Sequence, residues 1–289
     1  MRGFGLALGL AALGACTSAE IGPGTGPVGD GATSVLLTDA PFPFDEIARV
    51  DIHVDEIALS TSLDTSDGAP EWVVVSSPDR TFNLLDLQNG STALLGEAVV
   101  PPGQYRAVRL VFDPSRSSMT TIDGEPIGAA AGPGSPGINW QAKGEAPSLF
   151  AIVEEALAIG ENGEEVVVDF DVGRSFLYDG AGGFTFLPYL RAITRAGSGA
   201  VSGRLLREDD GAPIARAVVS VHVAPDSTAQ LGPLLATTRS ATDGRFTASF
   251  LRPGRYQLTA EDLERNVTSE GVVVEVKAGA TAQAGELRF

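Results

Sequence analysis

The sequence has a single cysteine, Cys16, and only two histidines, His53 and His222. One cysteine cannot form an intramolecular disulfide, and two histidines far apart in the chain cannot supply the usual ligand set of a zinc site. A Ser-His-Asp or Cys-His catalytic site needs a histidine beside a nucleophile and a carboxylate, and neither local sequence indicates one. His53 lies on the polar side of an alternating segment, which predicts an exposed histidine with a structural role. We therefore expect no catalytic residue and no enzyme activity.

Basic residues are also scarce, since 20 Lys and Arg stand against 37 Asp and Glu and the net charge is -17. Such a charge repels nucleic-acid phosphates, so we expect no nucleic-acid partner. After the first sixteen residues, the sequence has no apolar run of the about 20 residues that a membrane-spanning helix needs. Tryptophan is absent after Trp140. The second half of the chain therefore lacks the flat aromatic ring that sugar-binding surfaces most often use.

The first sixteen residues have the pattern of an export signal: Arg2, an apolar run over residues 3–13, and small residues before Cys16. This segment resembles the bacterial lipoprotein signal. The resemblance implies cleavage of residues 1–15, lipidation of Cys16, contact with the membrane through the lipid anchor, and a location at the bacterial outer membrane or cell surface. An ordinary secretory signal with an incidental cysteine is the alternative.

The remaining composition predicts an all-β protein. Glycine occurs 35 times and proline 18 times, and valine and threonine are frequent, which is typical of short strands joined by tight turns. We expect two antiparallel β-sandwich domains behind the signal peptide. The predicted divisions are a flexible tether over 16–32, a β domain over 33–195, a linker over 196–199 and a seven-stranded sandwich over 200–289.

Two segments carry the clearest local signals. Val50, Ile52 and Val54 alternate with polar residues, which predicts a half-buried strand over 49–60 with a bulge at Asp55-Glu56. Pro-Gly-x-Tyr occurs twice, at 102–105 and at 253–256, where the glycine favours a turn and the tyrosine begins a strand. Strands are also expected over 81–87 and over 149–159.

Several motifs in the first domain occur in the order of a known family. They are Ser34 to Pro41 (SVLLTDAP), Asp86 to Gly90 (DLQNG), Pro102 to Tyr105 (PGQY), Val168 to Asp171 (VDFD) and Pro188 to Ala192 (PYLRA). Residues 33–195 therefore resemble the bacterial lipoprotein family called domain of unknown function 4382. Its function is not known, so the resemblance supplies no catalytic residue.

The last ninety residues resemble another family. Val201 to Arg204 (VSGR), Pro213 to Val219 (PIARAVV), Thr242 to Phe246 (TDGRF) and Leu251 to Tyr256 (LRPGRY) are similar to the carboxypeptidase-regulatory or prealbumin-like β-sandwich, close to modules of the collagen-adhesin B type. The resemblance implies a seven-stranded sandwich. Some such modules contain a lysine-to-asparagine bond, but Arg204 stands where the lysine would be needed, so we expect no isopeptide bond here.

Trp72 and Trp140 are the candidate ligand-binding residues, because aromatic rings stack on the apolar faces of sugars. The apolar context of Trp72, E-W-V-V-V, indicates a core position, whereas Trp140 follows a Gly- and Pro-rich stretch and is expected to be exposed. Four acidic residues are candidate calcium ligands, although no D-x-D-x-D-G loop is present. They are Asp39, Asp51, Asp169 and Asp171, with Asp55 nearby on the same strand as Asp51.

These observations predict a lipid-anchored envelope or cell-surface protein with a non-enzymatic binding or structural role. Carbohydrate or another surface protein is the expected partner. The alternative is an accessory or calcium-dependent component of a carbohydrate-active enzyme system, in which paired acids serve glycoside hydrolysis. No cofactor is expected, and calcium is the one ion that the acidic residues suggest.

Overall fold

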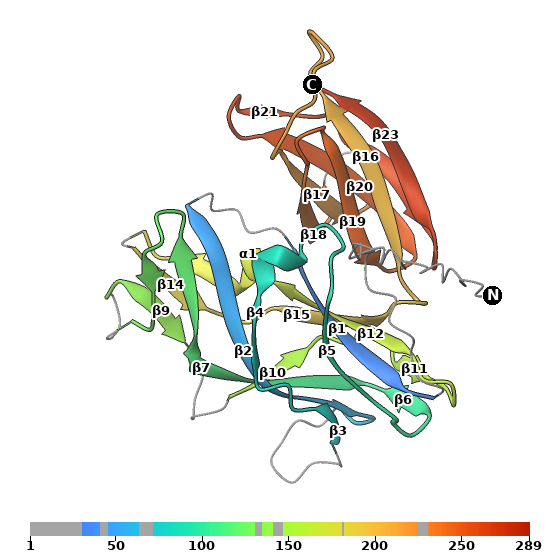
Figure 1. The fold of residues 1–289 in the computed structure, drawn as a ribbon. Coiled ribbons are helices and arrows are strands. Elements are labelled where there is room, and N and C mark those ends of the chain that lie inside the picture. The colour runs from blue at the N-terminus through green and yellow to red at the C-terminus, as the bar shows by residue number, and fades with distance from the viewer. Residues whose placement is uncertain are drawn as a thin grey trace, which may run out of the picture.

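The computed structural model describes residues 31–40, 46–63, 72–130, 135–140, 147–180, 182–224 and 231–289. Their regular structure is almost entirely β, as the sequence predicts, and the strands form two domains with separate hydrophobic cores (Figure 1). The predictions for the signal peptide, for Cys16 and for the tether up to residue 30 lie outside the described residues. Among the residues that are described, no helix is long and apolar enough to cross a membrane.

The first domain has two main sheets around one core. One sheet has the strand order β15-β12-β1-β5, and the other has the order β10-β7-β2-β3, with β4 paired to β2 and β8 paired to β7. The strands are β1 (Thr33–Ala40), β2 (Ile47–Ser60), β3 (Val73–Ser76), β4 (Arg80–Asn83), β5 (Ala93–Ala98), β7 (Ala107–Thr121), β8 (Pro126–Ile127), β10 (Ser148–Ala151), β12 (Glu165–Asp171) and β15 (Leu190–Thr194).

The two sheets meet at both of their edges, so the strands surround the core. A bridge between Ile152 and Arg191 connects the end of β10 to β15. At the opposite edge, the Ser76 hydroxyl on β3 donates a hydrogen bond of 2.8 Å to the carbonyl oxygen of Leu95 on β5. This approach requires glycine at position 96, because a Cβ there would lie 2.0 Å from Ser76 Oγ.

Strand β2 confirms the predicted alternation. Val50, Ile52 and Val54 are fully buried in the core, and the register against β7 shifts between Val54 and Glu56, where the bulge was predicted. A second irregularity lies on β7: Asp51 pairs with Ser118 while His53 pairs with Asp113, so residues 114–117 leave the ladder. This excursion of β7 lies next to His53, where it contributes to the candidate site described below.

Two predicted strands are shorter in the structure. The segment 81–87 becomes β4 followed by the 3-10 helix η1 (Leu84–Leu87), because the Asn83 side chain accepts a hydrogen bond from the Leu85 N–H and caps the helix. The segment 149–159 becomes β10 and β11 (Leu157–Ile159). Short strands complete the domain: β11 pairs with β6 (Gly103–Tyr105), and β14 (Gly183–Phe186) lies between β13 (Phe176–Tyr178) and β9 (Gly137–Trp140). The helix α1 (Val172–Ser175) follows β12.

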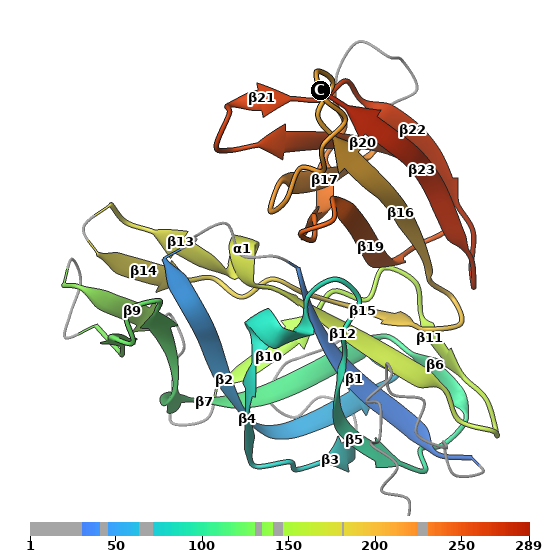
Figure 2. The same cartoon turned by 45° about the horizontal axis from the view of Figure 1, so that its top comes forward.

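The second domain is a sandwich of two sheets with orders β19-β16-β23 and β18-β17-β20-β22, with the short β21 on β20 (Figure 2). The seven predicted strands are all present. They are β16 (Gly199–Leu206), β17 (Val218–Val223), β18 (Leu234–Arg239), β19 (Arg245–Leu251), β20 (Gly254–Asp262), β22 (Val272–Val276) and β23 (Thr281–Arg288), and β21 (Val267–Thr268) is additional.

Not all strand pairs are antiparallel. β1 runs parallel to β12, with Ser34 opposite Glu165, and β16 runs parallel to β23. In the register of β1 and β12, Thr38 lies opposite Asp169 on the outward side of the sheet. Arg191 on β15 lies opposite Asp169 on its other side. The parallel pair therefore places charged groups on the side that faces the second domain.

The repeated Pro-Gly-x-Tyr motif forms the same local structure in both domains. The Tyr105 hydroxyl donates a hydrogen bond of 2.7 Å to the carbonyl oxygen of Pro101, and the Tyr256 hydroxyl donates one of 2.8 Å to that of Arg252. In each case the acceptor lies four residues before the tyrosine. Each hydroxyl therefore fixes the turn that precedes its own strand.

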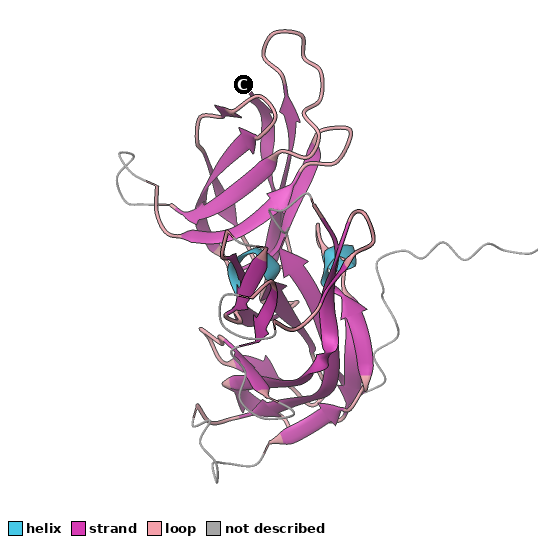
Figure 3. Ribbon diagram, turned by 90° about the vertical axis from the view of Figure 1, so that its left-hand side faces the viewer, coloured by secondary structure: helices cyan, strands magenta, loops and turns pink. Residues whose placement is uncertain are grey.

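The two domains are stacked one above the other (Figure 3) and joined by direct contacts. The Thr238 hydroxyl donates to the Asn89 side chain over 2.8 Å. Arg252 forms ion pairs with Glu154 and Glu155 of the first domain. The second domain is thus held on the outward side of β1, β12 and β15 by polar contacts from several strands.

Candidate functional site

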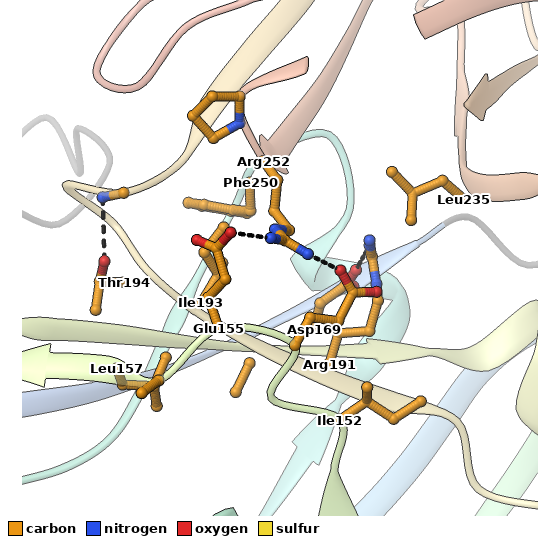
Figure 4. A pocket seen from close by; sticks show the side chains of 15 residues that line it. Ile152, Glu155, Leu157, Asp169, Arg191, Ile193, Thr194, Leu235, Phe250 and Arg252 are labelled. Atoms are coloured by element: carbon orange, nitrogen blue, oxygen red, sulfur yellow. Dashed lines mark hydrogen bonds and ion pairs between the residues drawn. The ribbon is translucent and has the colours of Figure 1, made fainter. Parts of the chain in front are cut away.

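A small cavity lies at the junction of the two domains (Figure 4). Its apolar wall comes from both domains, with Ile152 and Ile193 on one side and Leu235 and Phe250 on the other. Its volume is about 90 Å³, whereas pockets for small organic ligands usually hold about 300 Å³ or more. The cavity therefore has room for a few water molecules and fits a joint between domains better than a substrate pocket.

Three of the acidic residues predicted as calcium ligands lie near this junction. Asp39 is buried, where its carboxylate accepts hydrogen bonds from the Val172 N–H (3.1 Å) and the Gln88 amide (3.4 Å). Burial raises the pKa of Asp39 well above its usual range. Asp171 caps α1 by accepting the Arg174 N–H over 3.0 Å, and burial together with the charge of Asp169 raises its pKa to about 6.

These acids already have partners in the fold. Asp169 forms an ion pair with Arg191, and Asp39 and Asp171 hold the backbone at the start of α1. The fourth predicted ligand, Asp51, is paired with Arg49 over 2.7 Å on β2. The structure therefore gives each carboxylate a structural role, and calcium binding at these residues stays a prediction.

His53 differs from its predicted environment. It is 2% exposed, so the prediction of an exposed histidine is wrong. Its side chain lies on the outward side of β2, as the alternation requires, but it is covered there by residues from other strands. The Ser117 hydroxyl, from the excursion of β7, accepts the His53 backbone N–H over 3.0 Å.

Two carboxylates lie beside the His53 ring. Nε2 is 3.0 Å from Asp79 Oδ1 and 3.6 Å from Asp55 Oδ1, while Nδ1 is 2.8 Å from the Thr81 hydroxyl. In the part of the chain that the structure describes, this is the one group of three histidine or acidic residues whose ligand atoms lie within 4.8 Å of one another. We call it the His53 cluster. The sequence pattern pointed to Asp55 as an acidic residue near a possible ion site, but nothing in it pointed to Asp79, which only the fold brings next to β2.

Trp72 lies on the outward side of the second sheet and not in the core. Its ring is half-buried, the guanidinium carbon of Arg109 lies 4.7 Å from the ring centroid, and the Phe150 ring lies 5.9 Å away. Arg109 also pairs with Glu56 over 2.6 Å. We call these four residues the aromatic face. Its Phe150 is 40% exposed, so part of the aromatic surface meets solvent.

Trp140 has the opposite outcome. Its ring packs among three phenylalanines, with ring centroids 5.7 Å from Phe112, 5.9 Å from Phe176 and 5.0 Å from Phe186. The prediction that Trp140 is exposed is therefore wrong, because β9 pairs with β14 and turns the ring toward the core. Both rings are partly buried: Trp140 packs against the core, whereas Trp72 lies on the outward side of the second sheet.

Several solved structures show a distant likeness to this chain. A 9R-lipoxygenase from Cyanothece PCC8801 is 14% identical over 33% of this chain and 17% of its own, with a TM-score of 0.22. The Bacillus anthracis TIE protein is 12% identical over 89% of this chain and 34% of its own, with a TM-score of 0.25. The shaft pilin SpaA from Lactobacillus rhamnosus GG is 10% identical over 89% of this chain and 96% of its own, also with a TM-score of 0.25.

These TM-scores support no inference about function, and this chain spans only 17% and 34% of the length of the first two structures. No curated protein matches the chain. Two family profiles do match: the domain of unknown function (DUF4382) over residues 30–188 and the carboxypeptidase regulatory-like domain over residues 200–285. Because the first match covers more than half of the sequence, the chain belongs to the DUF4382 family, with a carboxypeptidase regulatory-like domain after it.

Proposed function

We propose that this protein is an exported, lipid-anchored protein of the bacterial envelope that binds carbohydrate without catalysing a reaction. The sequence of residues 1–16 supports export and lipidation at Cys16. Neither matched family supplies a catalytic residue, and the acids of the junction are used by the fold. The observation that carries the binding role is the aromatic face on the outward side of the second sheet.

The aromatic face has the chemistry that sugar recognition needs. Trp72 and Phe150 present ring surface that can stack on the apolar side of a sugar ring. Arg109 and Glu56 lie within the same face and supply hydrogen-bond donors and acceptors for hydroxyl groups. The strands β2, β7 and β10 hold Glu56, Arg109 and Phe150 at fixed spacings, and Trp72 directly precedes β3, so little conformational entropy is lost on binding.

The junction cavity, Trp140 and the second domain support this role less well than the aromatic face. The cavity at the junction is too small for a sugar ring and its neighbours, and the partly buried Trp140 ring packs against the core. The second domain has no tryptophan, so its family fold alone would be the basis for binding there. The polar contacts at the junction instead suit a second domain that holds the first domain, and with it the aromatic face, in a fixed orientation.

The test is a glycan array with residues 17–289, which retain every described element, and with the variants Trp72→Ala and Phe150→Ala. Each variant should weaken binding by about tenfold or more, equivalent to about 1.4 kcal/mol. Tyr178→Ala is the matched control, because Tyr178 is an aromatic residue of the same domain with 49% exposure, outside the aromatic face. Circular dichroism of each variant separates loss of binding from loss of fold.

Three outcomes would contradict the proposal. An array without binding would favour a structural role or a protein partner, and the lipidated protein would then be used to isolate envelope proteins that associate with it. Binding that survives both Trp72→Ala and Phe150→Ala would place the sugar site elsewhere on the chain. Detectable hydrolysis of a bound glycan would favour the alternative of a carbohydrate-active enzyme component.

A further inference from the structure

The His53 cluster brings together three side chains that the chain separates. His53 and Asp55 are two residues apart on β2 and therefore lie on the same side of the strand. Asp79 comes from the connection between β3 and β4 and reaches the same place because β4 pairs with β2, with Thr81 opposite His53. The cluster is independent of the aromatic face, so this inference does not rest on sugar binding.

The fold determines which ring nitrogen of His53 faces the carboxylates. Nδ1 is 2.8 Å from the Thr81 hydroxyl, which leaves Nε2 directed at Asp79 and Asp55. The Ser117 hydroxyl accepts the backbone N–H of His53 and donates to the Asp113 carbonyl oxygen over 2.7 Å, so the covering segment of β7 is also held in place. In metal-binding histidines, the ring nitrogen that does not bind the metal is commonly fixed by a hydrogen bond, as Nδ1 of His53 is by Thr81.

We propose that His53 Nε2 and the carboxylates of Asp55 and Asp79 bind one divalent transition-metal ion of the zinc class. Ligand atoms about 2.0–2.2 Å from a tetrahedral zinc lie about 3.3–3.6 Å from one another. The distances from Nε2 are 3.0 Å to Asp79 and 3.6 Å to Asp55, so only a small movement of side chains is needed. One imidazole with two carboxylates suits zinc or manganese, whereas calcium takes oxygen ligands alone.

The site would be open on its solvent side. Asp79 is 70% exposed, so its carboxylate can rotate to meet an ion and leave a fourth position for water. Arg116 lies on the excursion of β7, and its guanidinium is 2.6 Å from Asp79 Oδ1. This cation competes with a metal for the same oxygen. Removal of Arg116 should therefore strengthen metal binding. If Asp79 served only as the surface ion-pair partner of Arg116, the same substitution would have no effect on metal binding.

The experiment is calorimetric titration of zinc chloride into residues 17–289 without a histidine tag. This form lacks Cys16, so no thiol can bind the metal. One zinc ion per chain is expected, with binding weakened about tenfold or more in His53→Gln and in Asp55→Asn. Arg116→Ala should bind more tightly than the unmodified chain. Asp51→Asn is the matched control, because Asp51 is an acid of the same strand that pairs with Arg49, and its binding should not change.

Several results would overturn the proposal. These are the absence of saturable heat, equal affinity in His53→Gln, and stoichiometric binding of calcium but not of zinc. Tryptophan fluorescence reports whether His53→Gln is folded. If that variant unfolds, Asp55→Asn decides the question, since the Asp55 side chain is partly exposed and its replacement leaves the buried ring in place. Weak binding that is the same in all variants would show unspecific association with an acidic protein.

Discussion

Replacement of Asp171 with asparagine is expected to stabilise the first domain at neutral pH. Asp171 is 3% exposed, and burial together with the charge of Asp169 raises its pKa from 3.8 to about 6. The Arg174 N–H and the charges of Arg174 and Arg191 lower this pKa but do not cancel the effect of burial. A pKa of about 6 in place of 3.8 corresponds to about 3 kcal/mol between the two protonation states.

The folded domain binds the Asp171 proton more tightly than the unfolded chain does. The contribution of this group to stability is therefore fully present below about pH 4, falls as the pH rises toward 6, and is lost above that value. The pKa of Asp39 is also raised well above 3.8, mainly by burial, so its contribution to stability is likewise lost as the pH rises. Asparagine remains uncharged throughout and can still accept the Arg174 N–H, so the cap of α1 is retained.

Urea unfolding at about pH 4.5 and about pH 7.5 measures this effect. Tryptophan fluorescence reports on the first domain alone, because both tryptophans, Trp72 and Trp140, belong to it. The Asp171→Asn variant should match the unmodified chain within about 1 kcal/mol at the lower pH and exceed it by about 2–3 kcal/mol at the higher pH.

Asp113→Asn is the control for this experiment. The pKa of Asp113 is lowered, chiefly by the hydrogen bond from the Ser115 hydroxyl, so its replacement should cost stability at neutral pH instead of adding it. An equal loss of stability at both pH values in Asp171→Asn would refute the reasoning. It would show that Asp171 acts only as a helix cap and that its burial carries no electrostatic cost.

Three further predictions concern packing and the junction. Tyr105→Phe and Tyr256→Phe should each lose about 1 kcal/mol of unfolding free energy, measured by fluorescence for the first domain and by circular dichroism for the second, because each removes one hydrogen bond to a turn. Trp140→Ala should lose about 3 kcal/mol in urea unfolding, since its partly buried ring packs against the core beside three phenylalanines, and unchanged stability would contradict that placement. Arg252→Ala should change stability by less than about 1 kcal/mol but speed proteolysis near residues 196–199, because it breaks the ion pairs between the domains.

Local patterns in the sequence predicted much of the fold. The alternation of Val50, Ile52 and Val54 requires a strand with one buried side, and the structure has that strand together with the bulge that follows it. The strands of the second domain are short and bounded by turn residues, so each could be located from its own segment. In these cases, neighbouring residues contain the information that determines the element.

The environments of single side chains depended on distant segments and could not be predicted in this way. His53 is on the outward side of β2 as expected, but residues 114–117 leave the ladder and cover it. Trp72 directly precedes β3 in an apolar run, yet its ring lies on the outward side, where Arg109 packs on it. Trp140 follows a Gly- and Pro-rich stretch, but its pairing partner is β14, more than forty residues later.

The parallel pairing within each domain has a consequence for how the chain folds. Ser34 on β1 pairs with Glu165 on β12, and β16 pairs with β23, so an early strand of each domain needs a partner that follows much later in the sequence. Contacts between such distant positions slow folding, because a long loop must close before they form. As the chain is made from its N-terminus, β1 can pair with β5 on one edge, but its other edge stays open until β12 has followed. Each domain therefore completes its sheet only when its late strand, β12 or β23, is available.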